Sequence, residues 1–238
     1  MTTKTGIPAS LIMFTLALAI SGPTSSAKTN AAANAVGVEV GEALRKLRSG
    51  NERFISGKTR TDGQAQSDVA RLSTAQSPHS VVLSCSDSRV PPEIVFDQKL
   101  GEIFTVRTAG ESLSASAVGS IEYAVQKLGS RLIVVLGHTN CGAVKAAVET
   151  LGGKTTGSDN LDQLVADIHP RIRSKFDAKN PSQDLKAESW LNAQGVAQDL
   201  LKRSPLLAKA VESGSVKIQV GLYHLSDGVV EFEPKGLK

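Results

Sequence analysis

The chain has 238 residues, of which 40% are hydrophobic and 21% charged, and its 27 Lys and Arg against 23 Asp and Glu leave a formal net charge of +4. This length suits a single domain with a short tail, and the apolar content supports a buried core, which excludes a disordered chain. Two cysteines exclude a disulfide-stapled mini-fold and a multi-zinc array, and an aromatic content of 4% with so small a charge excess predicts no nucleic-acid partner.

Residues 1–27 have the pattern of a secretory signal peptide. Lys4 provides a positive charge, and the apolar run of residues 11–20 is shorter than the roughly 20 residues that a membrane-spanning helix needs. Ser25 and Ala27 place small residues at positions −3 and −1 of a signal-peptidase cleavage site after Ala27. We therefore expect an exported protein, periplasmic or secreted, without stable membrane insertion after processing, in which residues 28–37 are a flexible lead-in. A retained N-terminal anchor and a buried core helix are the alternatives.

Helix-like and strand-like segments alternate over residues 38–238, which we take as one domain. Apolar side chains recur at helical spacing in residues 38–54, and further helices are predicted at residues 67–75, 115–128, 142–151, 161–176 and 188–201. Strands are predicted at residues 80–84, 103–107, 131–136, 215–223 and 229–232. Because continuous Val, Ile and Leu runs mark strands buried on both faces, we predict an α/β fold. Its central β-sheet is mostly parallel and flanked by helices, with an N-terminal helical arm and a C-terminal strand pair.

Both cysteines follow predicted strands. Cys85 comes directly after the first strand, and His138 and Cys141 follow the third strand, three residues apart. Ligand sites of open parallel sheets lie beyond the carboxyl ends of the strands, so these three side chains are expected to converge. Two thiolates and an imidazole suit Zn²⁺, and three protein ligands leave a fourth position for water or substrate, as in catalytic zinc sites. Asp87 is a candidate for that fourth position.

Other interpretations of these residues stay open at this point. In an exported protein the two cysteines could form a disulfide, or they could be inert buried thiols. Asp87 and Arg89 could be a turn with an ion pair. The other three histidines lack Cys or acidic neighbours at ligand spacing and are expected to be ordinary solvent-facing or hydrogen-bonded residues; they are His79, His169 and His224.

Five short motifs together resemble those of the β-class carbonic anhydrases in their bacterial, exported form. They are SCSDSR at residues 84–89, FDQ at 96–98, FTVR at 104–107, SIEYAV at 120–125 and GHTNCGAV at 137–144. The resemblance extends over nearly the whole domain. It implies an enzyme that hydrates CO₂ reversibly to bicarbonate and a proton, by attack of zinc-bound hydroxide on CO₂.

The resemblance also implies roles for the residues near the cysteines. Cys85, His138 and Cys141 would be the ligands of one Zn²⁺ per chain. Asp87 would hydrogen-bond the hydroxide, or would itself bind the metal in a closed state of the site. Arg89 would pair with Asp87 and hold it off the metal.

A second set of residues matches positions that contact substrate in this family. Gln76 matches an amide that hydrogen-bonds the substrate, and Gly142 matches a glycine whose backbone lies beside it. Phe104, Ala109 and Tyr123 match positions that line the pocket from the neighbouring subunit. The resemblance therefore implies a homodimer or a larger even homo-oligomer.

Two competing functions share much of this pattern. A hydrolase acting on CS₂ or COS would have the same scaffold and the same metal ligands. A non-enzymatic envelope protein with a disulfide or a stored zinc ion would have the same cysteines.

Overall fold

The computed structural model describes residues 37–173 and 181–236. The expected signal peptide, residues 1–27, and nearly all of the expected lead-in, residues 28–37, lie outside the described residues, as does the end of the helix predicted over residues 161–176. Within the described ranges, no helix is both long enough and apolar enough to cross a membrane.

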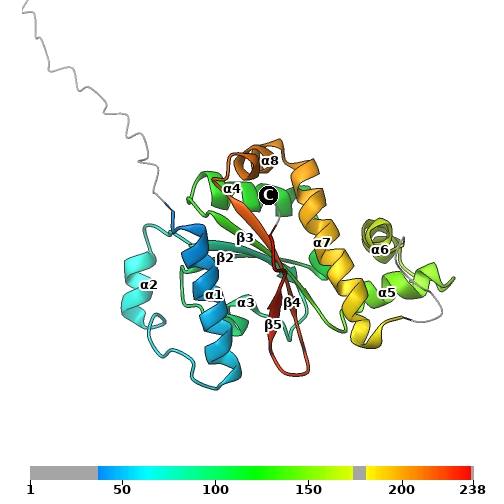
Figure 1. Ribbon diagram of the computed structural model, residues 1–238, viewed down its shortest axis with the longest axis horizontal. Coiled ribbons are helices and arrows are strands. Elements are labelled where there is room, and N and C mark those ends of the chain that lie inside the picture. The colour runs from blue at the N-terminus through cyan, green and yellow to red at the C-terminus, as the bar shows by residue number, and fades with distance from the viewer. Residues whose placement is uncertain (1–36, 174–180, 237–238) are drawn as a thin grey trace, which may run out of the picture. The chain divides into compact units, whose positions relative to one another are not determined.

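Five strands form one sheet in the order β2-β1-β3-β4-β5 (Figure 1). The strands are β1 (Ser80–Cys85), β2 (Ile103–Thr108), β3 (Leu132–His138), β4 (Lys217–Tyr223) and β5 (Val230–Phe232). The first four strands pair in parallel, and β5 pairs antiparallel with β4. The predicted α/β fold with a mostly parallel sheet and a C-terminal strand pair is therefore confirmed.

Burial on both faces explains the uninterrupted apolar runs in the central strands. Every residue of β1 and of β3 is buried. Along β1, Val81 and Leu83 belong to the hydrophobic core on one face, whereas Val82 belongs to the core on the other face. Successive side chains of a strand point to opposite faces, so such a strand needs an apolar residue at each position.

Six helices match segments that the sequence predicts to be helical. They are α1 (Val40–Ile55), α2 (Gln66–Leu72), α4 (Ala115–Gln126), α5 (Gly142–Leu151), α6 (Asp159–Ile172) and α7 (Lys186–Arg203). The sequence pattern predicts neither α3 (Pro92–Val95) nor α8 (Pro205–Glu212). Both begin at a proline, which suits the first turn of a helix. α3 has only four residues, too few for a periodic pattern to be recognised, and α8 follows the end of α7 after the single residue Ser204. Two 3₁₀ turns, η1 (Ala109–Glu111) and η2 (Gln183–Leu185), complete the described elements.

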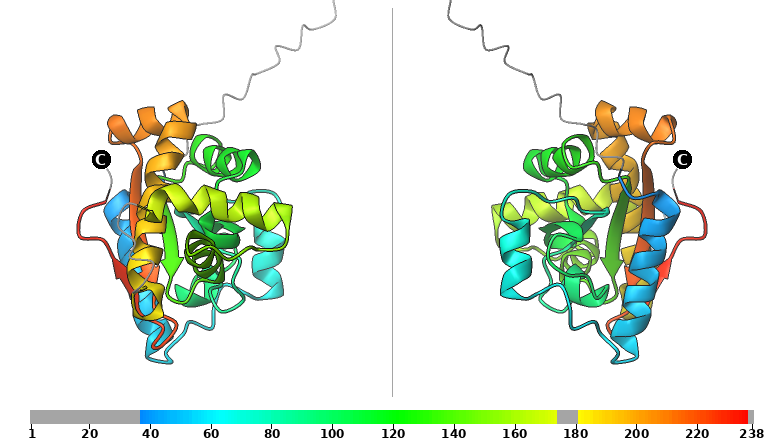
Figure 2. Two further views of the ribbon diagram at one scale, coloured as in Figure 1. Left: turned by 90° about the vertical axis from the view of Figure 1, so that its right-hand side faces the viewer. Right: turned by 90° about the vertical axis from the view of Figure 1, so that its left-hand side faces the viewer.

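The helices cover both faces of the sheet. Side chains of α4, α7 and α8 complete the core that contains Val81, and side chains of α1 and α3 complete the core that contains Val82. Figure 1 shows α1 and α7 on the two sides of the strands. A third, smaller core joins α5 to α6, which lie in the foreground of the left panel of Figure 2.

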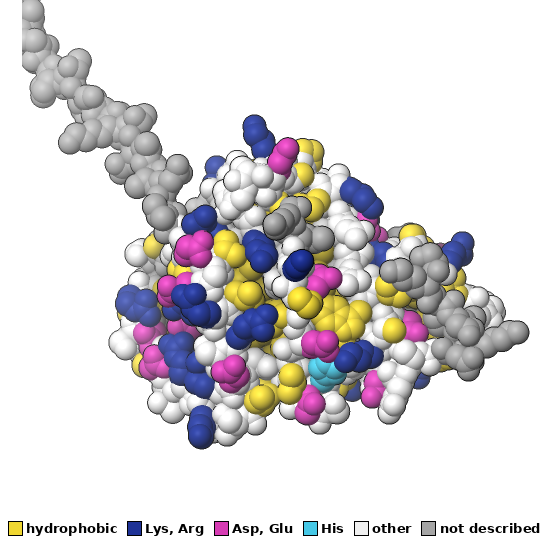
Figure 3. All heavy atoms as spheres, in the orientation of Figure 1, with side chains coloured by type: hydrophobic (Ala, Val, Ile, Leu, Met, Phe, Trp, Pro, Cys, Tyr) yellow, Lys and Arg dark blue, Asp and Glu magenta, His cyan; other side chains and the backbone are white. Residues whose placement is uncertain are grey.

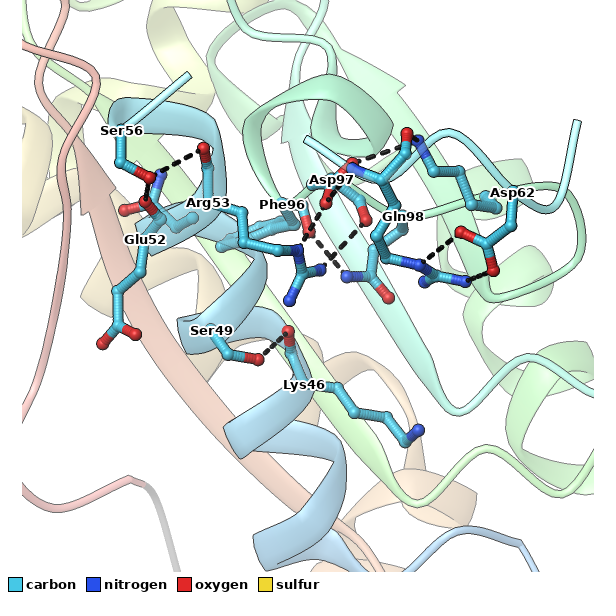
Figure 4. Close-up of polar contacts among 12 residues, drawn as sticks. Lys46, Ser49, Glu52, Arg53, Ser56, Asp62, Phe96, Asp97 and Gln98 are labelled. Carbon is cyan, nitrogen blue, oxygen red and sulfur yellow. Dashed lines mark hydrogen bonds and ion pairs between the residues drawn. The ribbon is translucent and has the colours of Figure 1, made fainter. Parts of the chain in front are cut away.

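Helix α1 is held to the body of the domain by close packing and by polar contacts. A Cβ on Gly50 would lie 1.7 Å from the Phe96 carbonyl oxygen, so only glycine allows this approach. The Asn51 side chain donates to the carbonyl groups of Val95 and Gly228 and accepts from the Val230 N–H. Beside them, the Arg53 guanidinium donates to the buried Asp97 carboxylate (Figure 4). The helical arm is therefore part of the fold of its own chain.

The outer face of α1 carries both signs of charge. Its exposed charged side chains are Glu42, Arg45, Lys46, Arg48 and Glu52. Glu42 pairs with Arg45 and with Lys46 one turn along the helix. Figure 3 shows basic and acidic side chains interspersed over this part of the surface.

Candidate metal centre

The fold brings the two cysteines and His138 together at one edge of the sheet. Cys85 is the last residue of β1, and His138 is the last residue of β3. These strands are parallel neighbours, with Ser84 opposite Leu136, so their carboxyl ends lie side by side. Cys141 follows at the N-cap of α5. The predicted convergence of the three side chains is confirmed.

The three donor groups form a compact and buried cluster. One ligand atom from each residue lies within 4.8 Å of the other two. The side chains of Cys85, His138 and Cys141 are all buried. Both cysteines are free thiols, and their sulfur atoms lie 4.0 Å apart, about twice the length of a disulfide bond. The disulfide interpretation therefore does not describe this structure.

The imidazole of His138 has one nitrogen engaged and one available. Its Nδ1 donates to the Thr139 carbonyl oxygen at 2.9 Å, which leaves Nε2 as an acceptor. Nε2 is buried and has no hydrogen-bond partner in residues 37–173 and 181–236. A buried nitrogen without a partner is unfavourable, and a metal ion between Nε2 and the two sulfurs would satisfy it. The donor set present therefore fits a metal ion.

The two thiols are within hydrogen-bonding distance of each other, with their sulfur atoms 4.0 Å apart. The hydrogen bond with Cys141 lowers the pKa of the Cys85 thiol. The same bond, together with burial, raises the pKa of the Cys141 thiol. A divalent cation bound between the sulfurs would hold both of them as thiolates.

Asp87 and Arg89 form a bidentate ion pair at the solvent side of the cluster. Asp87 Oδ1 accepts from Arg89 Nε at 2.9 Å, and Oδ2 accepts from Nη2 at 2.8 Å. The guanidinium holds the pKa of the Asp87 carboxyl well below its usual range. Oδ2 also lies 4.0 Å from His138 Nε2, so an ionised carboxylate stands next to the candidate metal position. Arg107 supports this loop by donating to the carbonyl groups of Cys85 and Asp87.

The predicted substrate-contacting residues separate into two groups in one chain. Ala109 begins η1, directly after the end of β2, and Gly142 begins α5 beside Cys141, so both lie at the edge of the sheet that holds the cysteines. A Cβ on Gly142 would meet no atom within 4 Å, so its backbone faces open space.

The second group lies at the opposite end of the strands. Gln76 precedes β1, whose start is about 17 Å from Cys85 at a rise of about 3.3 Å per residue. Gln76 and Tyr123 line one cavity of about 690 Å³, and the Tyr123 ring lies 6.5 Å from the ring of Phe104. Tyr123 is 51% exposed. One chain alone therefore does not place Gln76, Phe104 or Tyr123 at the cysteine cluster.

The other three histidines have ordinary partners, as expected. His79 contacts Ser80 and Gln98, His169 contacts Thr150, and His224 contacts Glu231; these partners are hydroxyl, amide and carboxylate groups. None of the three belongs to the cysteine cluster.

Two buried residues near the cluster have no signal in the sequence. Glu111 is 1% exposed, and burial raises the pKa of its carboxyl well above the usual value. Asn192, on α7, donates to it across a separation of 81 residues along the chain. Neither residue stands at ligand spacing from a cysteine, so only the folded chain relates them to the cluster.

Comparisons of sequence and of fold with known proteins all point to the same family. A family model described as carbonic anhydrase matches residues 80–230. The carbonic anhydrase of Mycolicibacterium smegmatis is 41% identical over 189 residues, which cover 79% of this chain and 91% of that protein. The fold is similar to that of the Coccomyxa β-carbonic anhydrase in complex with acetazolamide, with a TM-score of 0.62 at 23% identity over 84% of this chain and 88% of that one. A tetrameric β-carbonic anhydrase of Sordaria macrospora also has a TM-score of 0.62, at 20% identity over 83% of this chain and 100% of that one.

Removal of one donor atom is expected to remove the metal. We expect the Cys141→Ser and His138→Gln variants to be purified with little metal, because a hydroxyl or an amide binds a transition metal far more weakly than a thiolate or an imidazole. Elemental analysis of the purified proteins measures this. The His224→Gln variant is the control, since His224 contacts Glu231 outside the cluster. A Cys141→Ser protein with the metal content of the parent would refute the ligand set.

Proposed function

Because the chain belongs to the carbonic anhydrase family and has the fold of the β-carbonic anhydrases, we propose that it hydrates CO₂ with one Zn²⁺ held by Cys85, His138 and Cys141. The observation that carries this proposal is the buried His138 Nε2, which has no hydrogen-bond partner among the described residues and lies beside two free thiols. Two soft sulfur donors and one imidazole suit zinc. Because only three residues would bind the metal, its fourth coordination position is left open for water or substrate. The products are bicarbonate and a proton.

Zinc would supply the Lewis acidity that makes hydroxide available near neutral pH, where free water has a pKa of about 15.7. The residues of the chain then decide how the hydroxide is oriented. The Asp87 carboxylate, which Arg89 keeps ionised, would accept a hydrogen bond from the hydroxide and direct an oxygen lone pair at CO₂. The backbone at Gly142 faces open space beside Cys141, so it would contact the oxygens of the substrate.

Arg89 would also control whether Asp87 itself binds the metal. Both carboxylate oxygens of Asp87 are held by the guanidinium, yet Oδ2 is only 4.0 Å from His138 Nε2. With the ion pair intact the fourth position stays free for the reaction. If the pair opens, Asp87 is close enough to close the site as a fourth ligand.

The remaining pocket residues would come from a second copy of the chain. Gln76, Phe104 and Tyr123 gather far from the cysteines of their own chain, and Tyr123 is half exposed. A homodimer, or a larger even homo-oligomer, would place this group against the metal centre of the partner. Gln76 would then hydrogen-bond the substrate, and the two rings with Ala109 would form an apolar wall for CO₂.

Loss of the Asp87–Arg89 pair is expected to abolish most of the activity and to leave the metal in place. We expect Asp87→Ala and Arg89→Ala to hydrate CO₂ about 100-fold or more slowly than the parent in a stopped-flow assay, because the hydroxide is no longer oriented. Asp62→Ala is the matched control. Asp62 lies on the surface and makes the same kind of bidentate ion pair with Arg60, which is two residues away in the sequence. Exposed pairs of this kind contribute little.

Two results of that assay would contradict the proposal. One is a parent rate in both Asp87→Ala and Arg89→Ala, which would remove the role of the pair. The other is a parent protein whose CO₂ hydration persists after a chelator has removed its metal.

Mixing two inactive variants tests the contribution of the second copy. Gln76→Ala retains a metal centre, and Cys141→Ser retains Gln76, so a mixed dimer contains one complete site. Random assembly on co-expression is expected to restore about one quarter of the parent activity, since half of the dimers are mixed and each has one intact site of two. An activity equal to the mean of the two separate variants would show that Gln76 does not act across the interface.

We also propose that residues 1–27 are removed on export and that residues 38–238 are the mature catalytic domain, which is periplasmic or secreted. The basis is the signal-peptide pattern of the sequence. Expression of the full chain in a bacterium with a periplasm is expected to yield soluble protein there, with an N-terminus at residue 28. Protein that retains Met1 and stays in the membrane fraction would indicate an anchor.

A further inference from the structure

The 3₁₀ turn η1 lies next to Cys85 on its buried side, and one of its N–H groups donates a hydrogen bond to the Cys85 sulfur. The Gly110 N–H donates to Cys85 Sγ at 3.4 Å in a buried environment. Gly110 has φ of 60° and Glu111 has φ of 54°, so two successive residues adopt the left-handed conformation. For a residue other than glycine this conformation costs about 1–2 kcal/mol, so other contacts must hold the turn in this form.

Packing accounts for part of this constraint. A Cβ on Gly110 would lie 2.9 Å from Ala143 Cβ of α5 and 3.0 Å from Ile168 Cδ1 of α6. The turn therefore packs tightly between these helices and the end of β1, and position 110 has no room for a side chain larger than that of glycine. Packing alone does not set the direction in which the Gly110 peptide group points.

A single buried side chain sets that direction. Asn192 of α7 is fully buried, and its Nδ2 donates to the Gly110 carbonyl oxygen at 2.9 Å and to Glu111 Oε2 at 3.0 Å. Asn192 thus bonds the backbone of one turn residue and the side chain of the next. Glu111 Oε1 has no partner within the described part of the chain, so its contact with Asn192 is the hydrogen bond that keeps this carboxyl group in place.

Asn192 is itself fixed from the opposite side. Its Oδ1 accepts from Arg171 Nη1 at 3.2 Å. Arg171, which is almost fully buried, also donates to Asp199 at 2.9 Å and to Asp167 at 3.0 Å. The amide orientation is therefore set by a guanidinium that two carboxylates hold, and Nδ2 is left to face the turn.

We propose that Asn192 is a positioning residue of the metal centre, which holds η1 so that the Gly110 N–H draws negative charge from the Cys85 thiolate. Two thiolates donate more charge to a metal than imidazoles do, which opposes the Lewis acidity that CO₂ hydration needs. An N–H aimed at a ligand sulfur withdraws part of that charge, and hydrogen bonds to sulfur tune metal centres in this way. The inference rests on the proposed metal site and adds a residue that touches neither metal nor substrate.

The test uses the full chain with Co²⁺ in place of zinc, because the charge-transfer band from thiolate sulfur to Co²⁺ reports the charge on the sulfur. Asn192→Ala and Asn192→Leu both remove the amide, and the leucine variant also fills the space that alanine leaves empty. In both variants we expect the band to move to longer wavelength. We also expect zinc affinity, measured by competition with a chelator, to fall about 10-fold or more.

Asn51→Ala is the matched control for a general loss of stability. Asn51 is a similarly buried amide with three hydrogen bonds, but it joins α1 to Val95 and to the segment around Val230. Its substitution is expected to lower the melting temperature without moving the cobalt band or the zinc affinity of the folded protein.

The outcomes of these measurements separate this inference from the proposed function. If the cobalt band does not move in either Asn192 variant, or moves equally in Asn51→Ala, Asn192 does not position the Gly110 N–H. The proposed metal site would be unaffected by that result. A parent chain that binds no Co²⁺ would overturn the metal site itself, and this inference with it. A shift confined to the Asn192 variants supports the inference.

Discussion

The parallel pairing of β1 with β3 is the constraint on which the metal centre depends. The two strands are buried along their whole length, and Val81 and Val82 belong to cores on opposite faces of the sheet. A slip of one residue would exchange the two faces, so the cores fix the register of the pair. That register places Cys85 beside His138 at the carboxyl ends, and the turn into α5 adds Cys141. The donor geometry is thus a consequence of hydrophobic packing.

The centre has a solvent side and a buried side with different tasks. On the solvent side, Arg89 keeps the Asp87 carboxylate ionised and ready to orient a reactant. On the buried side, the Gly110 N–H contacts the Cys85 sulfur, and Asn192 holds Gly110 in place. In the proposed mechanism the first arrangement would orient the reacting oxygen, and the second would adjust the charge on a metal ligand. The N–H on the buried side would offset part of the negative charge that two thiolates bring to the proposed zinc ion.

Local sequence patterns predict the strands and the donor cluster, whereas features that only tertiary contacts create leave no such pattern. Apolar runs predict the first three strands, a turn at residues 226–228 predicts the last two, and strand ends next to Cys, His and Asp predict the cluster. Helix α3, with four residues, contains too few for a periodic signal. Asn192 lies 82 residues from Gly110, so no spacing rule connects them. The separation of Gln76 and Tyr123 from the cysteines is likewise visible only once the strand directions are known.

X-ray absorption at the zinc edge of the purified chain tests the proposed metal centre most directly, because it counts the sulfur and nitrogen neighbours of the metal without reference to activity. We expect two sulfur neighbours at about 2.3 Å and lighter neighbours at about 2.0 Å, one of them from an imidazole. A zinc ion with four sulfur neighbours, or with none, would contradict this ligand set.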